Sequence, residues 1–154
     1  MLRKMKAESP APAPGVSIGS AGPLAEIKPL LDACHLPTED IRPDALFVVA
    51  RAGTELCGTA GLEVFGASAL LRSVAVQPAW RGRGIARALC QEAMRRARAA
   101  QVGRVFLLTT DAERFFHGLG FAVVERGLLP AEIRATAQFR ELCPQTAVAM
   151  ARDL

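Results

Sequence analysis

The chain has 154 residues, of which 51% are hydrophobic and 22% charged, a composition that excludes disorder throughout. This length suits one domain that buries a core without disulfides or metals. The net charge of +4 is uneven, because residues 81–104 hold seven arginines and one glutamate, residues 1–14 are also basic, and the remainder is acidic. Such a distribution favours one local anionic ligand over a polyanion such as nucleic acid.

Residues 1–15 form a basic segment rich in proline and alanine, which predicts a disordered tail before a single domain of residues 16–154. The segment lacks the apolar stretch of a secretory signal, and no apolar run approaches the length of a membrane span. The four cysteines form neither a CxxC pair nor a recognisable zinc spacing. Free thiols, no metal and a soluble cytoplasmic protein are therefore expected.

Apolar periodicity and turn residues predict the elements of the first half. They are a strand at 16–18, a helix from Pro23 to Leu31, a loop or short helix at 35–40, and strands at 46–50, 56–65 and 69–76. The three later strands are joined by short turns, which predicts an antiparallel meander. Gly58 and Gly61 interrupt its middle strand, which is typical of a bulge.

The second half places helices between strands. A basic, glycine-containing loop at 78–84 is followed by a helix at 85–100 that Gly103 closes, a strand at 105–108, a helix at 111–119, a strand at 121–125, a connection at 127–143 with a helix around 132–139, and a strand at 146–150. The continuous apolar run at 105–108 is typical of a buried parallel strand.

The most informative segment follows the strand that ends at Val76, where a glycine turn leads at once into a helix. Gly82 and Gly84 allow backbone angles closed to other residues and let a ligand approach the main chain. The first amides of the helix lack intrahelical partners and carry the positive end of its dipole. With Arg81 and Arg83 beside them, they predict a pyrophosphate-binding cradle, and the alternative is a surface helix with solvated arginines. The P-loop motif is missing, and the turn lies too late in the chain for a dinucleotide-binding fold.

Two segments resemble the GNAT superfamily of N-acetyltransferases. Arg-Gly-Arg-Gly-Ile-Ala at 81–86 is similar to its acetyl-CoA signature, and residues 112–121, ending in Phe-Phe-His-Gly-Leu-Gly-Phe, are similar to its downstream helix and strand start. The resemblance implies an α/β (α+β) fold with a mixed, mostly antiparallel sheet, splayed between strands four and five and flanked by helices. It also implies an acyltransferase that uses acetyl-CoA as co-substrate and no metal.

A narrower resemblance involves residues 35–40, 71–76 and 130–144. They look like the acetyltransferases encoded with arsenic-resistance genes, relatives of enzymes that N-acetylate phosphinothricin and its arsenic analogue. This implies detoxification by acetylation of a primary amine in a small amino-acid-like compound, such as an arsenic- or phosphinate-containing toxin. The alternatives are a catalytically silent CoA-binding sensor or scaffold, and an acetyltransferase of a protein or peptide amine. A homodimer is left open, and neither nucleic acid nor a membrane is an expected partner.

The family resemblance also implies the cofactor contacts. Backbone amides at Val74 and Val76 hold the pantetheine arm and polarise the thioester. Many members protonate the leaving thiolate with a tyrosine, but Phe116 occupies that position and the chain contains no tyrosine. Water, a hydroxyl of Ser73 or Thr110, or no acid at all then serves this step. The implied cofactor residues are Val74, Ala75, Val76, Arg81, Gly82, Arg83, Gly84, Ile85, Ala86, Arg87, Thr109 and Phe116.

Acetylation of an amine also requires a base for the ammonium proton. Glu63 is the candidate, acting directly or through water, and the alternative is a solvent-facing strand carboxylate. Arg72 either pairs with Glu63 or clamps an anionic substrate group, since a guanidinium suits carboxylate, phosphinate or arsinate oxygens. Cys143 is either a ligand for a trivalent arsenical or a buried structural thiol. The candidate catalytic residues are Glu63, Arg72 and Ser73, and the candidate acceptor-binding residues are Phe65, Arg72, Gln138 and Phe139.

Overall fold

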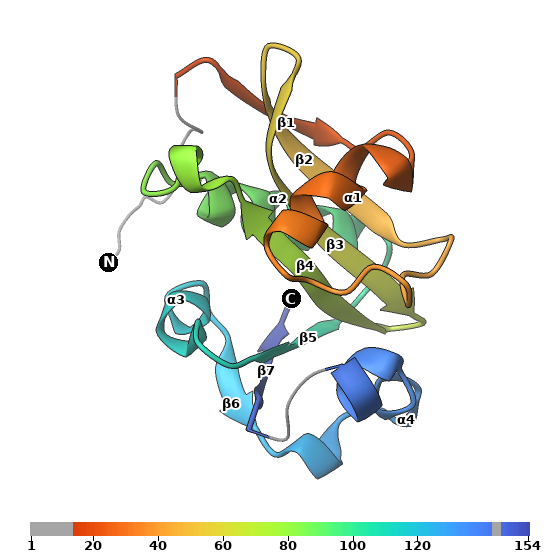
Figure 1. Cartoon of the computed structure of the whole chain (residues 1–154). Coiled ribbons are helices and arrows are strands. Elements are labelled where there is room, and N and C mark those ends of the chain that lie inside the picture. The colour runs from red at the N-terminus through yellow and green to blue at the C-terminus, as the bar shows by residue number, and fades with distance from the viewer. Residues whose placement is uncertain (1–13, 143–145) are drawn as a thin grey trace. The chain divides into compact units, whose positions relative to one another are not determined.

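The computed structural model describes residues 14–142 and 146–154, which form two compact units (Figure 1). Unit 1 comprises residues 14–38, 47–61 and 73–93, and unit 2 comprises the other described residues, 39–46, 62–72, 94–142 and 146–154. Segments far apart in the sequence thus share a unit. The predicted tail lies largely outside the described residues, and the single domain of residues 16–154 stays a prediction.

A seven-stranded sheet has the strand order β1-β2-β3-β4-β5-β7-β6. The strands are β1 (Val16–Ser20), β2 (Leu46–Ala52), β3 (Glu55–Phe65), β4 (Ser68–Val76), β5 (Arg104–Thr109), β6 (Ala122–Val124) and β7 (Val148–Asp153). β4 pairs in parallel with β5, Ser68 opposite Arg104 and Leu70 opposite Phe106, whereas the β1–β2, β5–β7 and β6–β7 pairs are antiparallel. The predicted mixed α/β fold, with its parallel β4–β5 pair in an open sheet, is confirmed.

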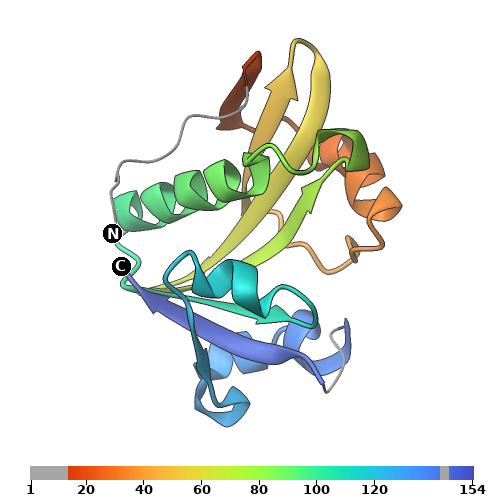
Figure 2. The same ribbon diagram turned by 90° about the vertical axis from the view of Figure 1, so that its left-hand side faces the viewer.

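In unit 1, α1 (Leu24–Ala33) and the first part of α2 (Ile85–Ala99) lie on opposite faces of the strands (Figures 1 and 2). Ile27, Leu30 and Leu31 form the buried side of α1. Their three- and four-residue spacing is the amphipathic pattern that predicts this helix.

Gly58 allows β3 to pack closely against its neighbours in unit 1. A Cβ atom at this position would lie 3.0 Å from the carbonyl oxygen of Ala75 and 3.0 Å from Cδ1 of Leu89. Such contacts are tighter than most real Cβ atoms make, so close approach of β3, β4 and α2 explains this glycine. Strand interiors often use glycine in this way.

Unit 2 combines β5, β6 and β7 with short helices. These are α3 (Glu113–His117), α4 (Ala131–Arg134), a 3-10 turn at Arg126–Leu128 and a π-helical turn at Gln138–Leu142. The predicted helix around 132–139 is therefore two short pieces. No helix in the described ranges is long and apolar enough to cross a membrane. A core cluster in this unit comprises Leu70, Phe106, Leu129, Ile133, Ala149 and Ala151, with Phe65, Leu108, Val124 and Phe139 packed against it.

The end of α2 differs from the sequence prediction. Gly103 does not close the helix, because Gln101 takes the left-handed conformation with φ of 66° and the Val102 amide donates to the Ala97 carbonyl at 2.9 Å. This is the usual hydrogen-bonded ending of a helix with glutamine in the place of glycine. Gly103 instead starts the approach to β5, and its amide donates to the Ala67 carbonyl at 2.8 Å.

Candidate functional site

The segment predicted to be an anion cradle lies where β4 passes through a 3-10 turn (Pro78–Trp80) and a glycine turn into α2 (Figure 2). Gly82 and Gly84 have φ of 79° and 76°, and no heavy atom lies within 4 Å of a Cβ built on either. The turn thus requires glycine for its backbone angles and leaves space above the main chain. The first turn of α2 holds no acidic residue, so nothing there opposes an anion at the helix N-terminus.

Two arginines of the turn are held by the chain around them. Arg81 donates from Nε to the Val76 carbonyl at 3.0 Å, and its Nη2 lies 3.9 Å from Cys34 Sγ. Arg83 stacks on Trp80 with its guanidinium carbon 4.8 Å from the ring centroid. Both remain exposed, as does Arg87 in the first turn of α2. The turn thus places two partly held guanidinium groups beside the N-terminus of α2.

The second half of β4 contains a positive φ angle that the residue type does not predict. Ser73 has φ of 56°, an uncommon angle for a residue with a side chain and a recurrent one at functional sites. This angle redirects the peptide groups that lead to Val74, while Ala75 and Val76 are buried. Val74 and Val76 are the residues whose amides the family resemblance assigns to the pantetheine arm.

Glu63 and Arg72 lie together in unit 2 and are both buried. Their side chains are each 2% exposed, and Arg72 Nη1 lies 3.4 Å from Glu63 Oε2. The same Oε2 accepts a hydrogen bond from the Arg42 amide at 3.2 Å. The alternative of a solvent-facing Glu63 is therefore wrong, and the predicted pairing of Arg72 with Glu63 is present.

Arg72 has a second carboxylate partner that the sequence analysis missed. Asp40 receives both guanidinium ends, Nη1 to Oδ2 at 2.6 Å and Nη2 to Oδ1 at 2.8 Å. A substrate anion could be clamped by Arg72 only after these bonds open. Asp40 lies 32 residues from Arg72 in a connection without periodicity, so no local signal links the two.

The candidate acceptor residues Phe65 and Phe139 pack against the same core cluster of unit 2. A guanidinium stacks on each ring at 4.6 Å, Arg42 on Phe65 and Arg126 on Phe139. Gln138 begins the π-helical turn next to Phe139. Cys143, the proposed arsenical ligand, lies outside the described residues.

Thr109 and Phe116 occupy structural positions around α3. Thr109 Oγ1 accepts a hydrogen bond from the Ala112 amide at 3.0 Å, which satisfies one donor just before the helix. Phe116 is buried and makes edge contacts with Phe115 and Phe121 at 5.0 and 5.9 Å. No hydroxyl stands at this position, whereas Thr110 is exposed.

Burial disfavours the reactive thiolate form of two cysteines. Burial raises the pKa of the Cys57 thiol, and it raises the pKa of the Cys90 thiol to about 12. Cys34, at the end of α1, is partly exposed. The described residues contain no group of three or more metal-ligating side chains.

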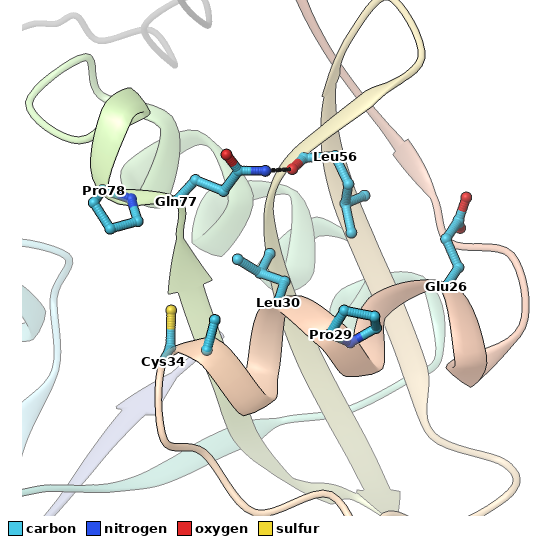
Figure 3. A pocket seen from close by; sticks show the side chains of 8 residues that line it. Glu26, Pro29, Leu30, Cys34, Leu56, Gln77 and Pro78 are labelled. Carbon is cyan, nitrogen blue, oxygen red and sulfur yellow. Dashed lines mark hydrogen bonds between the residues drawn. The ribbon is translucent and has the colours of Figure 1, made fainter.

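A cavity of about 370 Å³ opens in unit 1 between α1 and the residues that flank β3 and β4 (Figure 3). Gln77 crosses it and donates from Nε2 to the Leu56 carbonyl, while its backbone amide donates to the Cys57 carbonyl at 2.8 Å. Its lining is mostly apolar and consists of Glu26, Pro29, Leu30, Ala33, Cys34, Leu56, Gln77 and Pro78.

The chain belongs to the acetyltransferase (GNAT) family, whose profile matches residues 20–121. One curated relative is the amino-acid acetyltransferase of Mycobacterium tuberculosis (strain ATCC 25618 / H37Rv), which is 37% identical over 84 residues. That match covers 54% of this chain and 45% of the relative, so the chain spans less than half the relative's length. The profile match confirms the predicted membership of the GNAT family.

Solved structures show the same fold. N-acetylglutamate synthase from Neisseria gonorrhoeae, complexed with coenzyme A and N-acetyl-glutamate, has a TM-score of 0.77 at 21% identity over 90% of this chain and 35% of that one. An acetyltransferase from Streptococcus agalactiae 2603 has a TM-score of 0.70 at 20% identity, covering 92% of this chain and 99% of its own. Rv2747 from Mycobacterium tuberculosis, in complex with CoA, has a TM-score of 0.62 at 28% identity, with 70% and 75% coverage.

Proposed function

We propose that this protein transfers the acetyl group of acetyl-CoA to the primary amine of a small amino-acid-like compound. The observation that carries the proposal is the glycine turn at 81–84 before α2, where Gly82 and Gly84 have positive φ and open space above the main chain. With the exposed Arg81 and Arg83 beside it, the N-terminus of this helix suits a pyrophosphate. Two similar structures hold coenzyme A, and the curated relative is named an amino-acid acetyltransferase. These names support a small amino acid over a protein acceptor.

Acetyl-CoA supplies an acetyl group already activated as a thioester. Glu63 accepts one proton from the substrate ammonium group, directly or through water, so that the amine can attack as a neutral nucleophile. The nitrogen–carbon bond forms and the carbon–sulfur bond breaks. The nitrogen then loses its second proton, which passes through water to the CoA thiolate because Phe116 carries no hydroxyl. The amides at Val74 and Val76 stabilise the developing oxyanion.

Within this class, we propose that the substrate is an amino acid with an anionic side chain, including phosphinate and arsinate analogues. The resemblance of residues 35–40, 71–76 and 130–144 to arsenic-resistance acetyltransferases supports this part. Under this proposal, Phe65, Gln138 and Phe139 line the acceptor side.

CoA-thiol release with a panel of amines tests the proposal. The panel contains glutamate, phosphinothricin, arsinothricin, other common amino acids and a lysine-containing peptide. Turnover should be greatest with an acidic amino acid or one of its two analogues. Tight CoA binding without turnover on any amine would favour the sensor or scaffold, and preference for the peptide would favour a protein acceptor.

Glu63→Gln tests the base. Its kcat should fall on the order of a hundredfold or more, the range of general-base catalysis, while the affinity for CoA stays unchanged. Glu132→Gln removes an exposed carboxylate on α4 and is the matched control. Equal activity in both variants would remove Glu63 from the mechanism.

A further inference from the structure

Asp40 lies in the connection between α1 and β2 and has no role in the function described so far. Its side chain is 10% exposed, and both its oxygens bind Arg72. A buried ion pair contributes little net stability compared with apolar side chains of the same size, since desolvation offsets the attraction. The arrangement of this pair around Glu63 therefore merits a functional explanation.

One cation is shared unequally between two carboxylates. Arg72 makes its two short, parallel bonds, 2.6 and 2.8 Å, with Asp40, whereas its contact with Glu63 is 3.4 Å long. Bidentate pairing is the strongest geometry open to a guanidinium. Asp40 thus holds the guanidinium of Arg72 in a fixed orientation. The interaction of Arg72 with Asp40 is stronger than its interaction with Glu63.

The hydrogen bonds of Glu63 fall on one oxygen. In the described residues both of them, from the Arg42 amide and from Arg72, end on Oε2. Oε1 is therefore the oxygen that can receive a proton. Residues 39–46 supply Asp40 and Arg42 together, so a single segment sets the position of Arg72 and of Glu63 Oε2.

We propose that Asp40 is a positioning residue, which keeps Arg72 from closing a bidentate pair with Glu63 and so keeps Glu63 available as a base. In the part of the chain that the structure describes, the charged side chain in contact with Glu63 is Arg72 from β4, which also binds Asp40. Arg42 from the connection contacts Glu63 through its backbone amide, and its guanidinium binds Asp44. This inference rests on the proposed function. Without Asp40, the fork of Arg72 turns to Glu63 and stabilises its charged form, which makes it a weaker base.

Asp40→Asn in the full chain tests the inference, with Glu39→Gln as the matched control, because Glu39 is an exposed neighbour in the same connection. In Asp40→Asn, kcat should fall on the order of tenfold to a hundredfold, as for other residues that orient a functional group. The acid limb of its pH–rate profile should move to lower pH, while KM for acetyl-CoA stays the same. Asp40→Glu keeps the charge and should keep the acid limb in place.

A second readout does not depend on turnover. The carbon-13 signal of the Glu63 carboxyl group, assigned with Glu63→Gln, should titrate at lower pH in Asp40→Asn than in the unaltered protein. Asp40→Ser serves the same purpose if Asp40→Asn does not fold.

The two readouts separate the two proposals. Active protein whose acid limb and carboxyl signal are unmoved by loss of Asp40 overturns the positioning role, as does an equal effect of Glu39→Gln. Inactivity of the unaltered protein on every amine, together with a moved carboxyl signal, overturns the proposed function and leaves the control of Glu63 by Asp40 standing.

Discussion

The glycine turn of unit 1 and the charged cluster of unit 2 both hold charged or polar groups in fixed positions. They do so in different ways. The turn at 81–84 is exposed, local in sequence and built on backbone groups whose angles two glycines permit. The cluster of Asp40, Glu63 and Arg72 is buried, built from side chains, and assembled from three separate segments. A site built from backbone amides recognises the charge of a ligand. A cluster of charged side chains can instead set the reactivity of one of its members.

The difference also predicts how each region fails. Damage to the turn should weaken binding with modest loss of stability, because few buried contacts depend on it. Substitution of a residue in the cluster should mainly lower the stability of the fold, because removal of one partner leaves a buried charge without its counter-ion.

Arg72→Met should have the largest effect. It removes the cation between Asp40 and Glu63 and leaves two buried carboxylates unpaired, so the free energy of unfolding should fall by about 3–5 kcal/mol, measured by urea denaturation. Arg51→Met is the matched control, because the Arg51–Glu26 pair is 28% and 33% exposed and such surface pairs contribute little to stability. Equal losses in the two variants would erase the distinction between buried and exposed charge.

Gly84→Val should come next and should act on binding. A β-branched residue at φ of 76° is strained by about 1–3 kcal/mol, so the turn will adopt another conformation. The Kd for CoA, measured by calorimetry, should rise on the order of tenfold to a hundredfold.

The control for this variant is Gly53→Val in the β2–β3 hairpin. Gly53 has φ of 62°, and a Cβ there also meets no atom within 4 Å. The strain is thus comparable while the cradle is untouched. A loss of CoA affinity in Gly53→Val equal to that of Gly84→Val would show that strain alone, rather than the cradle, explains the effect.

The effect that is smallest at neutral pH concerns buried and exposed thiols, because it begins only above about pH 8.5. Burial raises the pKa of Cys90 to about 12, against about 8.5 for a thiol in an unfolded chain. The protonated thiol therefore favours the folded state fully below pH 8.5, and this contribution declines between about pH 8.5 and pH 12, by about 1.4 kcal/mol per pH unit.

Chemical denaturation across this pH range checks the decline. Cys90→Ala should lose stability less steeply with rising pH than the unaltered protein. Cys34→Ala, which removes a partly exposed thiol, should retain the original slope. Identical slopes in all three proteins would contradict burial as the cause.

The sequence predicts the local backbone features better than the contacts between distant side chains. The glycine turn, the helices and the mixed sheet were predictable because glycine spacing and apolar periodicity are local. The Arg72–Glu63 pair was one of two open alternatives, since facing positions on neighbouring strands are limited in number. Asp40 was not predictable, because its partner is 32 residues away and depends on the course of an irregular connection.

Other differences arise from residues in unexpected backbone conformations. Gln101 and Ser73 adopt positive φ angles of 66° and 56°, which residue type alone would assign to glycine or asparagine. Local hydrogen bonds of the helix ending override that preference at Gln101, where the Val102 amide donates to the Ala97 carbonyl. The prediction for Gly103 was wrong for this reason.

Trp80 gives the cradle a built-in optical reporter. The chain has one tryptophan and no tyrosine, so its near-ultraviolet emission originates from one indole ring. That ring stacks with Arg83 at 4.8 Å, and its Nε1 lies 3.4 Å from Glu55 Oε2. Any anion that draws Arg83 away should change the brightness and colour of this emission, so occupancy of the cradle can be followed in real time on the unlabelled protein.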